Sequence, residues 1–219
     1  MTAALFLLGS PKTVPSTSGA LSKYLARQLR KCGVKTHTCP IGRIASVNEA
    51  FFLKLDESDI IILATPLYVD CLPYPVIHAL EAIAFYRQTI QNPKTQRFMC
   101  MVNCGFPEPR HNDTALAICR KFAQEVGFTW DGGLALGGGE AIGGKSLETL
   151  GWMTRNVRRS LDLTAQDLAS GQGISGVAAG LMAKPLIPGW IYSAIANFRF
   201  KRKAKRNRAF SRFYDHPYA

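Results

Sequence analysis

Acidic residues are scarce in this chain of 219 residues: 15 Asp and Glu stand against 27 Lys and Arg, for a formal net charge of +12. The imbalance is concentrated in residues 199–212, RFKRKAKRNRAFSR, which contain eight basic residues and no acid. The rest of the chain is only mildly basic. A hydrophobic fraction of 47% with 19% charged residues indicates a globular protein and excludes an intrinsically disordered one.

Cysteine is present, but not in the patterns that bind metals. None of the six cysteines forms a CxxC pair, so the compact cluster of an iron–sulfur centre and the ligand spacing of a zinc finger are both missing. We therefore predict no metal site. Several of the cysteines lie within apolar segments, which favours buried free thiols in a reducing compartment, the cytoplasm.

Long hydrophobic runs are also lacking. The apolar part of segment 171–219 is interrupted by Lys184, Pro185 and Pro188, and neither uncharged stretch beside Lys184 reaches the roughly 20 residues of a spanning helix. The apolar N-terminus, MTAALFLLGSP, has no basic region ahead of it. We therefore interpret it as a first strand and not as a signal peptide.

Hydrophobic patterning predicts alternating strands and helices in one domain, residues 1–170. Apolar or weakly alternating runs predict five strands, at 3–8, 34–39, 59–64, 97–104 and 128–136. Amphipathic patterns predict helices at 18–32, from Pro75 onward, at 113–126 and at 146–170. Strands joined through helices form a parallel sheet, and such sheets bind ligands beyond the carboxyl ends of their strands. The loops after the first, third and fourth strands should therefore carry the chemistry.

The first of these loops, GSPKTVPSTS at 9–18, combines hydroxyls with one lysine just before a helix. The N-terminus of a helix attracts anions through its unpaired N–H groups and its dipole. Hydroxyl donors and the charge of Lys12 would suit a phosphate. The spacing matches neither a Walker A loop nor GxGxxG, and the alternative is that Ser16 or Thr17 simply caps the helix.

The second loop, TPLYVDCLPYP at 65–75, is stiffened by three prolines and carries two tyrosines. A rigid loop with an aromatic residue at this edge can support one side of a flat ring. The alternative is a loop whose tyrosines pack on the neighbouring helix. Asp70 is interpreted as a solvated acid.

The third loop, NCGFPEPRHN at 103–112, offers polar groups beside a glycine. Gly105 lets the backbone approach a ligand closely, and Asn103 with the loop amides could hydrogen-bond the polar edge of a heterocycle. We interpret His111 as a surface residue and Cys104 as a packing residue. A glycine-rich stretch at 132–144 follows the fifth strand at the same edge and forms either a lid or a plain connection.

These loops together resemble those of the flavodoxin-like NAD(P)H-dependent FMN reductases, a family that includes quinone and azo-compound reductases. The likeness is carried by G-S-P-K…S-T-S at 9–18, A-T-P-L-Y…L-P at 64–73 and N-C-G-F-P-E at 103–108, and it covers about residues 3–165. It implies an α/β flavodoxin-like three-layer fold with a five-stranded parallel sheet in the order 2-1-3-4-5, followed by a basic helical extension at 171–219.

The resemblance also implies which residues bind FMN. The first loop would hold the phosphate, with Lys12 where many members have arginine. The second would frame the isoalloxazine, and the third would contact the polar edge of the ring. The implied cofactor-binding residues are Ser10, Lys12, Ser16, Thr17, Ser18, Pro66, Leu67, Tyr68, Val69, Leu72, Asn103, Cys104, Gly105 and Phe106.

The implied activity is that of an FMN-dependent oxidoreductase with NAD(P)H as co-substrate. Hydride would pass from the nicotinamide through FMN to a small-molecule acceptor: a quinone, a nitro or azo compound, or free flavin. No protein nucleophile is needed for this exchange, and we assign no catalytic residue. The alternatives are a flavodoxin-type electron carrier and a flavin-free binding protein of the same fold. Relatives imply a homo-dimer.

The basic C-terminal segment is open to three interpretations. Residues 189–212 mix Trp190, Ile191, Ile195, Phe198 and Phe210 with the basic cluster. That composition is typical of an interfacial helix on an anionic membrane. Basic residues with aromatics also suit nucleic acid, which we rank below the membrane surface. The third possibility is a solvated basic helix, or one packed on a partner subunit.

Overall fold

The computed structural model describes residues 2–12, 15–43 and 47–215, and its chain divides into two compact units. The first ends at Leu186 and the second begins at Ile187. Each unit is described by itself below.

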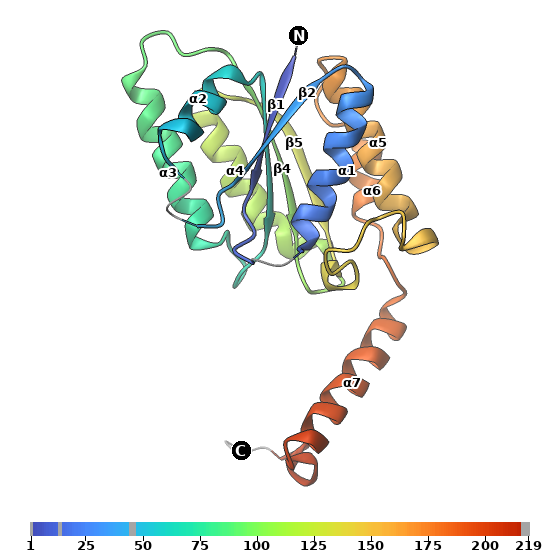
Figure 1. Ribbon diagram of the computed structural model, residues 1–219. Coiled ribbons are helices and arrows are strands. Elements are labelled where there is room, and N and C mark those ends of the chain that lie inside the picture. The colour runs from blue at the N-terminus through green and yellow to red at the C-terminus, as the bar shows by residue number, and fades with distance from the viewer. Residues whose placement is uncertain (1, 13–14, 44–46, 216–219) are drawn as a thin grey trace. The chain divides into compact units, whose positions relative to one another are not determined.

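A five-stranded parallel sheet forms the centre of the first unit, with helices on both faces (Figure 1). The strands are β1 (Ala3–Leu8), β2 (Lys35–Pro40), β3 (Ile60–Pro66), β4 (Arg97–Asn103) and β5 (Thr129–Leu136), in the order β2-β1-β3-β4-β5. This confirms the predicted flavodoxin-like fold, and each predicted strand lies within two residues of its expected bounds.

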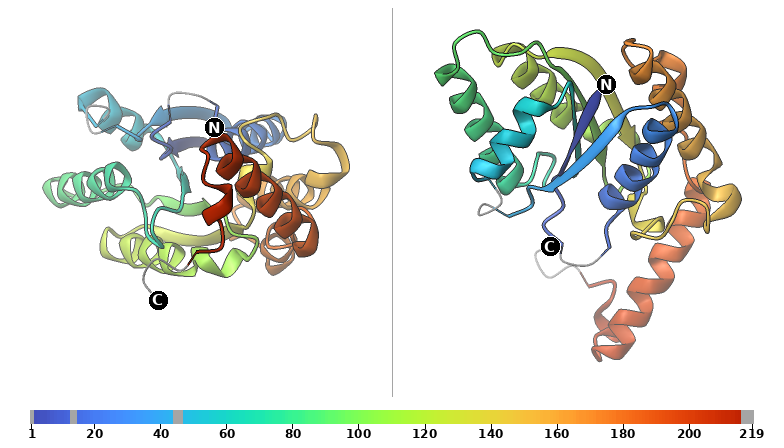
Figure 2. Two further views of the ribbon diagram at one scale, coloured as in Figure 1. Left: turned by 90° about the horizontal axis from the view of Figure 1, so that it is seen from below. Right: turned by 45° about the horizontal axis from the view of Figure 1, so that its top comes forward.

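The helices form the two outer layers (Figures 1 and 2). One face carries α1 (Thr17–Lys31), α5 (Arg155–Ala169) and α6 (Gly176–Met182), and the other carries α2 (Glu49–Glu57), α3 (Tyr74–Thr89) and α4 (Asp113–Glu125). The central strand shows why the sheet needs both layers. Ile60 and Ile62 pack in the core on the α1 side, whereas Ile61 and Leu63 pack in the core on the α3 side. Because side chains alternate along a strand, this continuous apolar run can be buried only between two layers.

The helix predicted to begin at 146 begins instead at Arg155. Gly151 has a φ of 56°, a conformation that breaks a right-handed helix. A single 3-10 turn, η4 (Gly151–Thr154), begins at this glycine. The buried hydroxyl of Thr154 donates to the carbonyl of Leu147, which fixes the preceding irregular segment.

Residues 171–186, which the sequence assigned to the extension, pack against the sheet domain. The guanidinium of Arg97 pairs with Asp131 and also donates to the carbonyl of Gln172. The N–H of Ile174 donates to the carbonyl of Asp131 over 2.7 Å. In α6, Met182 is buried in the core beside α5. The compact unit therefore continues sixteen residues beyond the predicted boundary at 170.

The second unit consists of α7 (Gly189–Arg206) and the short turn η5 (Phe210–Arg212), so the extension is helical as predicted. The turn packs back on the helix: the Lys205 ammonium lies 4.9 Å from the centre of the Phe210 ring. Among the residues that the structure describes, no helix has the length and apolarity to cross a membrane.

Candidate functional site

The loops after β1, β3, β4 and β5 lie at the carboxyl edge of the sheet. The hydrogen bonds between neighbouring parallel strands continue into the first residues of three of these loops. The N–H of Gly9 donates to Ala64 over 2.9 Å, Leu67 donates to Asn103 over 2.8 Å, and Cys104 donates to Leu136 over 3.0 Å. Each bond joins the first loop residues of one strand to the neighbouring strand. The predicted site residues of all three loops therefore lie at one edge, as the sequence indicated.

The first loop ends in a capped helix. The side-chain oxygen of Ser16 accepts a hydrogen bond from the N–H of Gly19 over 3.2 Å, so Ser16 is the N-cap of α1. Ser10 is half-buried, and Lys12 is exposed on the same loop. A helix N-terminus with a nearby ammonium group attracts anions. Capping and anion binding are compatible here, because a capping hydroxyl still has its own proton to donate.

The other two predicted hydroxyls are used within the protein. The buried Thr17 hydroxyl donates to the carbonyl of Gly139 over 2.7 Å. The Ser18 hydroxyl, also buried, accepts from the side-chain amide of Asn103 over 2.8 Å. Both residues lie at the predicted place, but their side chains bind neighbouring loops. Thr17 and Ser18 would therefore contribute to anion binding through the backbone N–H groups of the first helical turn.

The second loop begins with a strained two-residue hairpin. Tyr68 and Cys71 exchange backbone hydrogen bonds of 2.8 and 3.0 Å, and between them Val69 and Asp70 have φ angles of 48° and 55°. Positive φ is a true outlier for a β-branched residue. The Val69 side chain is 99% exposed and Tyr68 is exposed beside it. An exposed residue held under strain is a feature of binding sites.

Three predicted ring contacts of this loop are less accessible. Leu72 is buried and belongs to the core on the α3 side. Pro66 is half-buried as the last residue of β3, and Leu67 is half-buried against the same core. These three residues are wholly or partly buried, whereas Tyr68 and Val69 are exposed.

In the third loop, Asn103 and Cys104 are buried and Gly105 and Phe106 are exposed. Burial raises the pKa of the Cys104 thiol, although hydrogen bonds lower it in part. A protonated buried thiol is a packing group rather than a nucleophile. The ring centroid of Phe106 lies 4.6 Å from that of His111, which orients this exposed aromatic side chain.

The glycine-rich segment after β5 is closely packed and hydrogen-bonded at its start. Gly137, Gly138 and Gly139 are buried, and the N–H of Gly139 donates to the carbonyl of Cys104 over 2.8 Å. A Cβ at position 137 would lie 2.1 Å from the carbonyl oxygen of Pro107. The sequence left open whether this segment is a lid or a plain connection. The contacts at 137–139 support a close-packed connection.

This connection also touches the first loop, a contact that the sequence did not predict. A Cβ on Gly144 would lie 2.4 Å from the carbonyl carbon of Pro15. Glu140 is exposed between these anchors, and its side chain lies 3.9 Å from where a Cβ of Gly105 would be. The repeated glycines after β5 could have indicated this contact, because backbone packed directly on backbone leaves no room for a Cβ.

The edge thus combines two kinds of surface. A helix N-terminus with Ser10, Lys12 and Ser16 provides hydrogen-bond donors and positive charge. The exposed side chains of Tyr68, Val69 and Phe106 provide an apolar rim. Together they could bind a molecule with an anionic end and a flat, apolar end.

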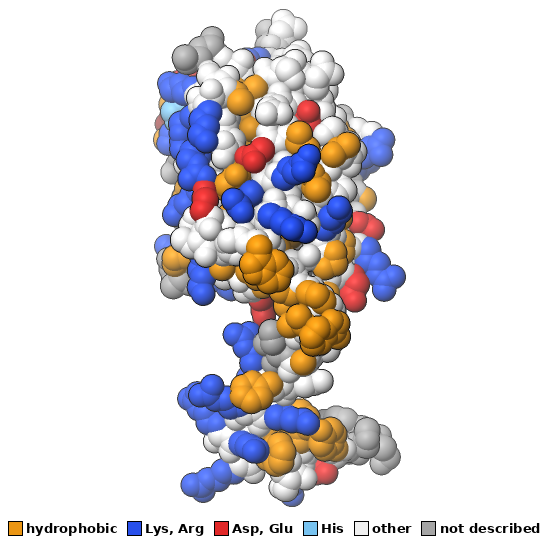
Figure 3. Space-filling model, turned by 90° about the vertical axis from the view of Figure 1, so that its right-hand side faces the viewer, with side chains coloured by type: hydrophobic (Ala, Val, Ile, Leu, Met, Phe, Trp, Pro, Cys, Tyr) orange, Lys and Arg blue, Asp and Glu red, His pale blue; other side chains and the backbone are white. Residues whose placement is uncertain are grey.

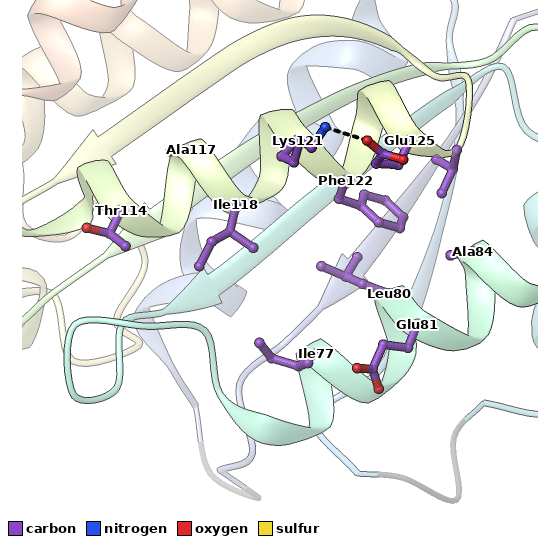
Figure 4. A pocket seen from close by; sticks show the side chains of 11 residues that line it. Ile77, Leu80, Glu81, Ala84, Thr114, Ala117, Ile118, Lys121, Phe122 and Glu125 are labelled. Atoms are coloured by element: carbon purple, nitrogen blue, oxygen red, sulfur yellow. Dashed lines mark ion pairs between the residues drawn. The ribbon is translucent and has the colours of Figure 1, made fainter.

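A separate groove of about 510 Å³ lies between α3 and α4 (Figure 4). Ile77, Leu80 and Ala84 line it from α3, and Ile118 and Phe122 line it from α4. None of its lining residues is a predicted site residue. It therefore plays no part in the arrangement at the sheet edge.

Comparison with solved structures finds other proteins of this fold. RosB with a bound 8-demethyl-8-formylriboflavin-5'-phosphate intermediate aligns with a TM-score of 0.60 and 12% identity, over 91% of this chain and 87% of its own. The FMN-dependent NADH-azoreductase of Bacillus anthracis, in complex with FMN, aligns with a TM-score of 0.55 and 11% identity, over 77% of this chain and 100% of its own.

A putative quinone reductase of Klebsiella pneumoniae aligns with a TM-score of 0.55 and 13% identity, over 77% of this chain and 85% of its own. No protein-family model and no curated protein sequence matches the chain. At these identities the comparisons show the flavodoxin-like fold.

Proposed function

We propose that this chain is an FMN-dependent NAD(P)H oxidoreductase acting on a small-molecule acceptor: a quinone, a nitro or azo compound, or free flavin. The observation that carries the proposal is the position of Asn103. Its side-chain amide donates to the Ser18 hydroxyl over 2.8 Å and to the carbonyl of Thr65 over 3.0 Å. One buried side chain thus holds the starts of α1 and of the second and third loops in a fixed arrangement.

The residues of the first loop fit a phosphate. Ser10 and Ser16 have hydroxyl protons to donate, Lys12 is exposed with its positive charge, and the first turn of α1 supplies backbone N–H groups. Lysine binds phosphate as a point charge, without the bidentate fork of arginine. The phosphate of FMN would be held by this set.

The other two loops fit a flat ring. Tyr68, Val69 and Phe106 expose apolar surface at the same edge, and Glu140 of the glycine-rich connection lies beside Gly105. Stiff aromatic and β-branched groups bury ring surface at a low cost in conformational entropy. The strain at Val69 is consistent with a loop shaped for a ligand.

When bound, FMN would supply the redox chemistry: hydride uptake from the nicotinamide and two-electron reduction of the acceptor. The chain's own task is to bind and orient. Lys12 and the α1 N-terminus fix the anionic end, while the Asn103 hydrogen bonds keep the loops from separating. The buried, protonated Cys104 takes no part in electron transfer.

Visible absorption of the purified protein, followed by titration with FMN, tests this proposal. We expect flavin bands with the shifted maxima of a bound chromophore, and steady oxidation of NADH or NADPH when a quinone is added. If no flavin is bound even after FMN is added, the proposal fails. Flavin binding without turnover of either nicotinamide nucleotide would favour an electron carrier and refute the enzyme assignment.

A further inference from the structure

Helix α7 carries large apolar side chains that the rest of the second unit leaves exposed. Trp190 is 75% exposed, Phe198 is 67% exposed and Phe200 is 61% exposed. Single exposed hydrophobic residues are common on soluble proteins, but clusters mark interaction surfaces. Trp190 and Phe198 lie within about 80° of each other around this helix and form such a cluster, whereas Phe200 lies about 160° from Phe198.

Charge is separated along the axis of this helix. Residues 185–198 contain no charged side chain, and the basic residues of 199–212 are all exposed. No acidic residue occurs between Asp167 and Asp215. An uncharged stretch of this length is too short to span a bilayer and suits an interfacial segment. Figure 3 shows hydrophobic and basic side chains gathered on this helix.

Part of the apolar half and two of the basic residues share one side of the helix. Trp190, Ala194 and Phe198 follow each other at intervals of four residues, and Lys201 and Lys205 continue the same row at intervals of three and four. Residues spaced in this way lie on one face of a helix. The face therefore runs from aromatic side chains into ammonium groups.

We infer that α7 binds an anionic lipid surface, with its apolar N-terminal half at the boundary between headgroups and acyl chains and its basic half on the lipid phosphates. Trp is favoured at this depth because its ring is apolar and its N–H is polar. Basic residues near such a surface each strengthen binding. This function goes beyond flavin chemistry and does not depend on it.

Nucleic acid is the less suitable partner for this surface. Ten residues of α7, Gly189–Phe198, extend about 15 Å with no positive charge to meet a phosphate backbone. Ile191 and Ala194 within this stretch have no ring on which a base could stack. Lipid accommodates both the aliphatic and the aromatic side chains of this half.

Co-sedimentation of the full chain with vesicles tests the inference. We expect binding to vesicles of equal parts phosphatidylcholine and phosphatidylserine, weakened by salt, and little binding to pure phosphatidylcholine. Replacing Lys201, Arg202, Lys203 and Lys205 together by Gln should weaken binding about a hundredfold or more. The matched control replaces Lys31, Lys35, Arg120 and Arg159 by Gln, four exposed residues of the first unit, and should have little effect.

The apolar half has its own test. Trp190→Ala with Phe198→Ala should weaken vesicle binding, whereas Trp152→Ala with Phe85→Ala should not, although both control residues are 71% exposed. In a variant with Trp130→Phe and Trp152→Phe, brominated lipids should quench the remaining fluorescence of Trp190. Circular dichroism confirms that each variant is folded.

Three results would overturn the inference. The first is equal vesicle binding by the quadruple Gln variant and by its control. The second is a Trp190 fluorescence that brominated lipid leaves unchanged. The third is tight binding of single-stranded RNA that depends on the basic residues, combined with no binding to the anionic vesicles, which would assign α7 to nucleic acid.

Discussion

The side-chain amide of Asn103, at the end of β4, donates to the hydroxyl of Ser18, which lies 85 residues earlier in the first turn of α1. Both residues are buried, and the same amide also donates to the carbonyl of Thr65. The start of a helix and the ends of two strands are therefore joined through one polar group. In a buried setting such a bond is costly to lose, because the partners left behind are desolvated and unpaired.

Replacing Asn103 with Ala should lower the free energy of unfolding by about 2–3 kcal/mol, because two buried hydrogen bonds disappear and their acceptors stay buried. Urea denaturation measures the change. The control is Asn197→Ala on the exposed surface of α7, which should leave stability nearly unchanged. If Asn103→Ala has the same free energy of unfolding as the parent, the hydrogen bonds of Asn103 do not stabilise the fold.

Relieving the strained hairpin should stabilise the protein. Two-residue turns in which both central residues have positive φ favour Asn-Gly, whereas left-handed backbone costs other residues roughly 1–2 kcal/mol each. We expect Val69→Asn combined with Asp70→Gly to raise the free energy of unfolding by about 1 kcal/mol. Thermal or urea unfolding would detect it.

The matched control for this turn is Val177→Asn, which replaces another exposed valine but in helix α6. It should give no stabilisation, since position 177 is helical and does not have the turn conformation that favours asparagine. A double turn variant that is no more stable than the parent would argue against strain at Val69 and Asp70.

Stability should depend on the ionisation of Asp59, which ties β1 to the segment before β4. Burial by itself would raise the pKa of Asp59, but the hydrogen bonds from Lys94 and from the N–H of Ala3 outweigh it and lower the pKa below 3.8. The folded state therefore favours the charged form. This contribution is fully present above pH 3.8 and is lost as the pH falls through the lower, folded-state pKa.

Comparison of the parent with Asp59→Asn by urea denaturation, from neutral pH to below 3.8, checks this prediction. The stability difference should be largest near neutral pH and should shrink in acid. In a Lys94→Gln background the pH-dependent part should be smaller, since the main partner of the carboxylate is gone. A difference that stays constant over the whole range would contradict the assignment.

Lys12 should strengthen FMN binding through its charge. We expect Lys12→Gln to weaken FMN affinity by about tenfold, the usual size of one lost charge-assisted hydrogen bond, and Lys12→Arg to retain it. The measurement is fluorescence quenching of FMN on titration with protein. Lys31→Gln, at the far end of α1, is the control that removes the same charge.

Salt provides an independent check on Lys12, because its ammonium group is exposed and therefore screened. The gap in affinity between the parent and Lys12→Gln should narrow as the salt concentration rises. Unchanged FMN affinity in Lys12→Gln at low salt would mean that the phosphate is bound elsewhere.

Local patterns predicted the sheet well, since buried parallel strands have an unmistakable composition. The run at 59–64 could be satisfied only by burial on both faces, and β3 occupies that position. The predicted start of the last helix at 146 was wrong because its apolar spacing continues through Gly151, whose left-handed backbone forbids the helix there. Periodicity reports which residues are buried and does not report backbone handedness.

The sequence by itself determined which loops meet at the carboxyl edge, because the parallel direction of the strands follows from the βαβ alternation and their order was implied by the family resemblance. Only the tertiary structure decided what each side chain does there. The hydroxyls of Thr17 and Ser18 and the amide of Asn103 have the chemistry of ligand-binding groups, yet they bind one another's loops. A polar group takes whichever partner lies within hydrogen-bond distance once water is excluded, and that distance is set by packing between segments far apart in the chain.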